Sequence, residues 1–129
     1  MAENKKTEGL NLQPQALEAE EAVLGSMMID EDAANKAISI LGSSHYFYKD
    51  SHKKIFEALE KLIYGGLLAN PITLKNYFEK EKDDLNIPEY LVKITKFSTS
   101  SRQAIEYSKL IFDLFVKREL IKISGDVID

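Results

Sequence analysis

The sequence predicts an all-α fold, a compact bundle of about six helices with a long C-terminal helix. Three observations support this fold class. Apolar residues recur at helical spacing in successive segments. No stretch of any length alternates as a half-buried strand would. The segments are joined by short connections without internal repeats, as in helical bundles.

The composition restricts the class of protein. With 129 residues and 14.6 kDa, the chain is expected to form one domain with a core of its own. It has no cysteine, which excludes disulfides, zinc–thiolate sites and a cysteine nucleophile. The net charge of −4 and the scarcity of basic clusters argue against strong nucleic-acid binding by this chain alone.

No apolar run approaches the ~20 residues that span a bilayer. The N-terminus has no apolar segment of the signal-peptide type. We therefore expect a cytoplasmic protein without a membrane partner.

The N-terminal third of the chain predicts an arm and two helices. Residues 1–13 are polar and aperiodic, so a disordered arm is expected there. A first helix is expected over residues 15–30, with acidic residues at its start, where the helix dipole favours them. Asp30 is a candidate N-cap for a short second helix over residues 31–41, which Gly42 ends.

The middle of the chain predicts two more helices. Asp50 is a candidate cap for a third helix, whose apolar positions have helical spacing and which Gly65 and Gly66 stop. Thr73 is a candidate cap for a fourth helix over residues 74–81.

Two further helices are expected after the fourth. Pro88 suits the first turn of a fifth helix. Ser100 and Gln103 have the spacing of a capping box, which predicts the start of the last helix.

The last helix carries two apolar faces, separated by polar wedges. At about 100° per residue, one face consists of Ile105, Phe112, Val116, Leu120, Ile123 and Val127. The other consists of Tyr107, Leu110, Ile111, Leu114, Phe115, Ile121 and Ile128. A helix packed on one core needs one apolar face, so a second face predicts a second partner. Because no stop signal precedes Asp129, we expect a fragment cut inside or just after an interaction helix.

The sequence gives no support for catalysis or for a cofactor site. Its glycines never form the GxxxxGK pattern of a phosphate loop, and no nucleophile has a recognisable base partner. His45 and His52 are too isolated for a metal site, and are expected to be a loop residue and a first-turn surface residue. We therefore expect no catalytic, cofactor-binding or metal-binding residues.

Two features allow alternative interpretations. Glu20 falls inside the apolar stripe of the first helix and could act as an acid or base. The favoured alternative is a half-buried carboxylate paired with a Lys, an Arg or a backbone N–H. Residues 45–48, His-Tyr-Phe-Tyr, could stack on bases, but the favoured alternative is an aromatic plug of the core under a loop.

Four segments, in this order, resemble the bacterial replicative DNA helicases of the DnaB type. Residues 18–25 read EAEEAVLG and are similar to the opening EAExxVLG helix of that family. Residues 46–59 resemble a family block in which an FY pair is followed by a histidine and then by an IF pair. A third family block, a glycine followed by a TL pair, is similar to Gly65-Gly66 and residues 71–74. Here Asn70-Pro71 stands where the family usually has an acidic residue before the TL pair. Ala104 and Tyr107 resemble its tyrosine–alanine helix, so the resemblance runs from about residue 13 to 126.

The resemblance implies that residues 14–129 are the helical N-terminal collar domain, truncated before the linker and the ATPase domain. The last helix would be the first arm of a dimerisation hairpin, and full-length chains would form dimers closing into a hexameric ring. Primase and a helicase loader would be partners. The full-length protein would unwind duplex DNA at the fork with ATP and Mg²⁺, whereas this fragment alone would be inactive.

The two apolar faces and the resemblance together predict a self-association surface on the last helix. Beyond Arg118 the helix is expected to project from the bundle. The predicted residues are Phe112, Phe115, Leu120, Ile121, Ile123, Val127 and Ile128. The alternative is a free-standing helical adaptor unrelated to helicases, and a GxxxxGK[ST] motif downstream in the gene would exclude that alternative.

Overall fold

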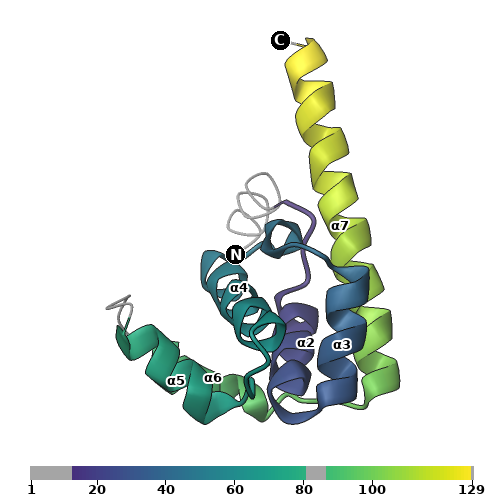
Figure 1. Cartoon of the computed structure of the whole chain (residues 1–129). Coiled ribbons are helices and arrows are strands. Elements are labelled where there is room, and N and C mark those ends of the chain that lie inside the picture. The colour runs from purple at the N-terminus through teal and green to yellow at the C-terminus, as the bar shows by residue number, and fades with distance from the viewer. Residues whose placement is uncertain (1–12, 81–86, 129) are drawn as a thin grey trace, which may run out of the picture.

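The computed structural model describes residues 13–80 and 87–128, with side chains up to residue 125 (Figure 1). The arm expected over residues 1–13 lies almost wholly outside the described residues. The elements are α2 (Leu17–Ile29), α3 (Glu31–Ile40), the 3-10 turn η1 (Ser44–Tyr46), α4 (Asp50–Tyr64), α5 (Pro71–Lys80), α6 (Ile87–Thr95) and α7 (Ser101–Ile128). The part of the chain that is described contains six α-helices and no strand, which confirms the all-α prediction.

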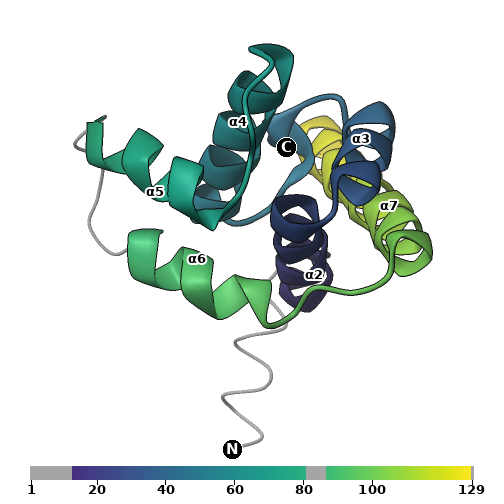
Figure 2. The same cartoon turned by 60° about the horizontal axis from the view of Figure 1, so that its bottom comes forward.

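Helix α2 is the centre of the domain. It packs against α3 and α7 on one side and against α6 on the other, and α5 covers α6 (Figure 2). Nearly every residue of α2 after its first turn is buried, including Glu20 and Ser26. Because this part of the helix has almost no solvent face, residues 22–28 are all apolar or small.

The end of α6 passes very close to α2. The Oγ of Ser26 accepts the N–H of Thr99 at 2.8 Å and donates to the carbonyl oxygen of Ala22 at 2.8 Å. A Cβ on Gly25 would overlap the carbonyl oxygen of Ile94, so only glycine allows this approach. The pair Gly25-Ser26 thereby fixes where the chain leaves α6 and turns into α7.

Two of the expected caps stand at the starts of helices. Asp30 is at the N-cap of α3, where its Oδ1 accepts the N–H of Asp32 at 2.9 Å. Ser100 precedes α7, and its Oγ accepts the N–H of Gln103 at 3.2 Å. The Gln103 side chain pairs with the Thr99 hydroxyl, so the reciprocal bond of a capping box is absent from this end.

The expected cap at Asp50 is wrong. Helix α4 begins at Asp50 itself, after Lys49, and no side chain caps it. Asp50 is exposed in the first turn and lies 3.8 Å from the Nζ of Lys53. Just before the helix, the backbone N–H groups of Tyr48 and Lys49 donate to Glu20 of α2, which fixes the chain on its way into α4.

The expected cap at Thr73 is also displaced. Helix α5 begins at Pro71, three residues before the expected first residue. The Oδ1 of Asn70 accepts the N–H groups of Ile72 and Thr73, and the Oγ1 of Thr73 accepts the N–H of Asn70 at 3.0 Å. Asn70 is therefore the cap and Thr73 its reciprocal partner, because Pro71 suits the first helical position.

The close approach at Gly25 gives a first prediction. Gly25→Ala should lower the free energy of unfolding by about 1–3 kcal/mol, because α6 must move to relieve the overlap. The control is Gly125→Ala in α7, where nothing lies within 4 Å of an added Cβ. There the better helix propensity of alanine should leave stability unchanged or raise it. Urea unfolding of both variants measures the difference, and equal effects would contradict the close contact.

Candidate self-association surface

The N-terminal part of α7, up to Arg118, contacts the domain, whereas the described apolar side chains after it are exposed. Ala104, Ser108 and Ile111 are buried at helical spacing against the bundle. The Ser108 hydroxyl donates to the carbonyl oxygen of Ala104 at 2.7 Å, so this buried polar atom is satisfied within the helix. Beyond this face the helix rises away from the other elements (Figure 1).

Arg118 holds α7 to the body at the point where the helix leaves it. Its guanidinium donates to the carbonyl oxygen of Pro14 at 2.7 Å and to that of Tyr46 at 3.0 Å. It also lies over the ring of Tyr48, 5.2 Å from the centroid. Burial lowers the pKa of Arg118. Because both carbonyls come from the domain body, Arg118 fixes the direction in which the rest of α7 projects.

The exposed apolar side chains of α7 gather beyond this anchor. Leu120, Ile121 and Ile123 are 58%, 50% and 56% exposed. We call residues 119–125 the α7 tip. Leu120 and Ile123 continue the face of Val116, whereas Ile121 lies on the other side of the helix. Val127 and Ile128, which also belong to the predicted surface, have side chains outside the described residues.

Phe112 and Phe115 have contacts within the chain. Their rings meet the ring of Tyr46 at 5.2 and 4.8 Å between centroids, and Phe115 also meets the ring of His45 at 4.8 Å. Phe112 remains 38% exposed, and Phe115 is half-buried. Of the two, Phe112 therefore offers more apolar surface to a second chain.

Residues 45–48 lie between α7 and the core. Phe47 is buried and its ring lies 4.9 Å from that of Phe56, while His45 and Tyr46 face α7. This is the arrangement of a core plug rather than of a platform with free aromatic faces.

Glu20 and His52 form the buried polar centre of the domain. The carboxylate of Glu20 accepts the N–H of Tyr48 at 2.7 Å and that of Lys49 at 3.4 Å. It also lies 2.7 Å from the Nδ1 of His52. The expected pairing of Glu20 with a backbone N–H is thus present, but His52 is fully buried rather than on the surface. The sequence could not reveal this, because the partner of His52 lies 32 residues away.

Tyr90 of α6 completes this network. Its hydroxyl lies 2.6 Å from the Nε2 of His52 and donates to Glu21 at 2.9 Å. Burial, followed by the hydrogen bond to Glu21, raises the pKa of Tyr90. The network joins α2, α4 and α6, and it leaves no free polar atom of Glu20 or His52 facing solvent. We assign it a structural role. Within residues 13–80 and 87–128, no three potential metal ligands of the His, Cys, Asp or Glu type cluster together.

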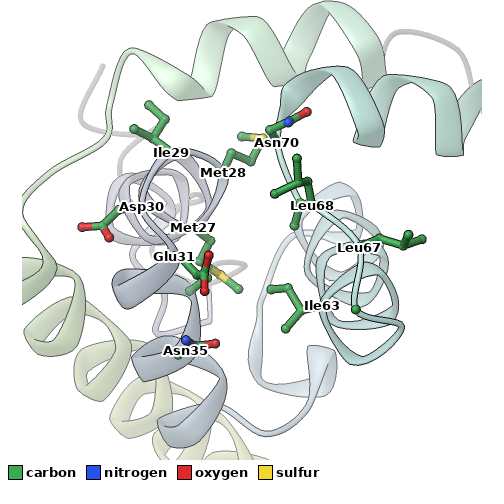
Figure 3. A pocket seen from close by; sticks show the side chains of 13 residues that line it. Met27, Met28, Ile29, Asp30, Glu31, Asn35, Ile63, Leu67, Leu68 and Asn70 are labelled. Atoms are coloured by element: carbon green, nitrogen blue, oxygen red, sulfur yellow. The ribbon is translucent and has the colours of Figure 1, made fainter.

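A second apolar surface was not expected from the sequence. A hollow of about 440 Å³ lies between the ends of α2 and α4, and we call it the α2–α4 groove. Met28 and Glu31 lie on one side of it and Ile63 and Leu68 on the other (Figure 3). Leu68 is 69% exposed although it is a large apolar residue. Leu67 and Leu68 directly follow two glycines, but nothing in this local pattern places them beside α2.

In the described part of the chain, no helix has the length and apolar character needed to cross a membrane.

Comparisons with known proteins give one consistent family. A family model described as the DnaB-like helicase N terminal domain matches residues 12–113. The replicative DNA helicase DnaB of Rickettsia typhi is 33% identical over 118 residues, which are 90% of this chain and 24% of that protein. The same-named protein of Pasteurella multocida is 34% identical over 119 residues, 88% of this chain and 25% of that protein.

The chain thus spans about a quarter of the length of these relatives. The crystal structure of the N-terminal domain of DnaB helicase from Mycobacterium tuberculosis has a TM-score of 0.85 to this fold. Its sequence identity is 24%, and the match covers 91% of this chain and 84% of that one.

The buried network gives a second prediction. Tyr90→Phe should lower the free energy of unfolding by about 1–3 kcal/mol, because it removes the hydroxyl that the buried Nε2 of His52 and the carboxylate of Glu21 both contact. Tyr77→Phe is the control, since the Tyr77 hydroxyl accepts from the exposed Lys61 at 3.4 Å and is not part of the buried network. Thermal unfolding of both variants tests the prediction. Equal losses would show that the Tyr90 hydroxyl does not support the core.

Proposed function

Because the chain belongs to the family of DnaB-like helicase N-terminal domains, we propose that it serves as the oligomerisation and partner-docking domain of a replicative DNA helicase. Residues 14–129 form this domain in the proposal. The observation that supports this proposal most directly is the α7 tip. Its apolar side chains are exposed just after Arg118, the residue at which the helix leaves the domain body.

The energetics of the tip favour association. Leu120, Ile121 and Ile123 are already about half covered in the single chain, so burying the rest of each side chain against another chain would contribute about 1 kcal/mol or slightly more. Part of this is offset by the entropy lost when two molecules associate and by the ordering of side chains. We therefore expect dimers or a mixture that shifts with concentration, rather than a stable ring of this chain alone.

Unwinding itself would belong to parts of the protein outside this chain. The relatives are about four times longer and are named replicative DNA helicases. We propose that the full-length protein unwinds duplex DNA with ATP and Mg²⁺, acts in the cytoplasm, and assembles as a hexamer. Primase and a helicase loader are its proposed protein partners. Strong nucleic-acid binding is not expected of this acidic domain.

A third prediction tests self-association. Leu120→Asp with Ile123→Asp should shift the protein to monomer while leaving the helical content unchanged, because both side chains lie beyond the packed half of α7. Sedimentation equilibrium up to about 100 μM measures the shift.

Val92→Asp provides the matched control for Leu120→Asp. Val92 of α6 is 59% exposed, against 58% for Leu120, so the two substitutions add the same charge at equally exposed apolar sites. Only Leu120→Asp should weaken association. A strictly monomeric parent, or a tip variant that unfolds, would contradict the proposal.

A fourth prediction concerns nucleotide hydrolysis. The purified chain should release no phosphate from ATP above the buffer blank, because its sequence has no phosphate loop. A colourimetric phosphate assay with and without Mg²⁺ tests this. Turnover that survives purification to homogeneity would place an ATPase site in this domain and contradict the proposal.

A further inference from the structure

The hydrogen-bond partners of His52 determine how many protons its buried ring carries. A neutral imidazole has one N–H donor and one acceptor nitrogen, whereas an imidazolium has two donors. The Nδ1 of His52 lies 2.7 Å from Oε1 of Glu20, and its Nε2 lies 2.6 Å from the hydroxyl oxygen of Tyr90. Each ring nitrogen thus has one short contact, and the hydrogens in these two contacts decide the charge of the ring.

The contact with Glu20 requires a hydrogen on Nδ1. The carboxyl group of Glu20 accepts the backbone N–H groups of Tyr48 and Lys49, and such donors stabilise the ionised form of an acid. An ionised carboxylate offers acceptors only. A carboxylic acid also gives up its proton more readily than an imidazolium does. The hydrogen between Glu20 and Nδ1 therefore belongs to the ring.

The contact with Tyr90 requires a hydrogen on Nε2 as well. The Tyr90 hydroxyl has a single hydrogen, which it donates to Oε2 of Glu21 at 2.9 Å. If this hydrogen pointed to Nε2 instead, the hydroxyl oxygen and the Glu21 carboxylate would face each other at 2.9 Å with no hydrogen between them, and they would repel. Tyr90 is therefore the acceptor in its contact with His52.

The charged groups around the ring suit a cation at this position. Glu20 and Glu21 of α2 face its two nitrogens, the first directly and the second through the Tyr90 hydroxyl. The Nζ of Lys49 lies 3.5 Å from that hydroxyl oxygen. Arg118 of α7 is attracted to Glu20, but it directs its hydrogen bonds to backbone carbonyl oxygens. A carboxylate thus lies beyond each ring nitrogen, as a buried cation requires.

We propose that His52 is an imidazolium in the folded domain at neutral pH, and that its second proton is a pH-sensitive clamp between α2, α4 and α6. The ring donates to α2 through Glu20 and to α6 through Tyr90. Without the proton, Nε2 and the Tyr90 oxygen would be two facing acceptors at 2.6 Å, so α6 would have to move or the hydroxyl would have to turn away from Glu21. This inference does not depend on the proposed function, because it concerns the fold of the single chain.

Loss of this proton at alkaline pH should destabilise the domain. In an unfolded chain, histidine is mostly neutral above about pH 6.5. A folded domain that keeps the proton gains its full contribution to stability below that pH and loses it as the pH rises. Unfolding in this range releases one proton, so the unfolding equilibrium constant should rise by up to about tenfold per pH unit between about pH 7 and 8.

Nuclear magnetic resonance of the full chain with 15N-labelled histidine counts the ring protons directly. At about pH 7 we expect a bonded hydrogen on both Nδ1 and Nε2 of His52. His45→Gln assigns the signals, because His45 is the other histidine of the chain and is exposed. A His52 ring with only one bonded hydrogen at this pH would overturn the inference.

Glu21→Gln tests whether Glu21 sets the number of protons on the ring. The glutamine amide can donate to the Tyr90 oxygen, which frees the hydroxyl to donate to Nε2. Nε2 should then lose its hydrogen at about pH 7, and the proton-linked pH dependence of unfolding should disappear. Glu18→Gln is the matched control, since it removes the same charge from an exposed position in the first turn of α2. This control should keep both ring hydrogens and the pH dependence of the parent.

Urea unfolding of the parent and of both variants across this pH range gives the second readout. Equal pH dependence in the parent and in Glu21→Gln would overturn the inference, because the clamp would not be linked to a proton. If Glu21→Gln does not fold, the number of ring hydrogens in the parent still decides. None of these outcomes bears on self-association, so the proposed function stands or falls separately.

Discussion

The architecture depends on satisfying one buried carboxylate at the centre of the domain. Glu20 lies in a helix enclosed on all sides, and an unpaired carboxylate there would be strongly destabilising. Its partners are the backbone of Tyr48 and Lys49 and the ring of His52, so the connection into α4 must pass beside α2. That connection begins at Tyr46, whose carbonyl oxygen accepts from Arg118. A constraint in the core thereby determines where α7 leaves the domain and which part of it stays exposed.

The helical fold could be predicted from the sequence because most of its signals are local. Apolar spacing located all six described helices, and Asp30 and Ser100 stand at helix starts where short-range capping preferences favour them. The two wrong cap predictions arose where the helix begins earlier in the chain than its local sequence suggests. Asp50 has no capping role because α4 already begins at this residue, with Lys49 at the N-cap position, and Asn70 rather than Thr73 is the cap ahead of Pro71.

Of the two candidate surfaces, only the α7 tip could be predicted from the sequence. The α7 tip could be predicted because two apolar faces on one helix predict two partners, and Leu120, Ile121 and Ile123 are exposed as expected. The α2–α4 groove could not, because its walls come from segments more than 30 residues apart. His52 was misplaced for the same reason, since burial through Glu20 and Tyr90 leaves no trace in its local pattern.

The central claim is that the α7 tip is uncovered in the single chain and covered by a second copy. Amide hydrogen exchange of the unmodified protein at low and high concentration measures this directly. The account predicts fast exchange over residues 119–125 in the dilute protein, and protection there at high concentration. The amides of α2 should be protected equally at both. Exchange at the tip that is independent of concentration, in a protein that does associate, would contradict the account.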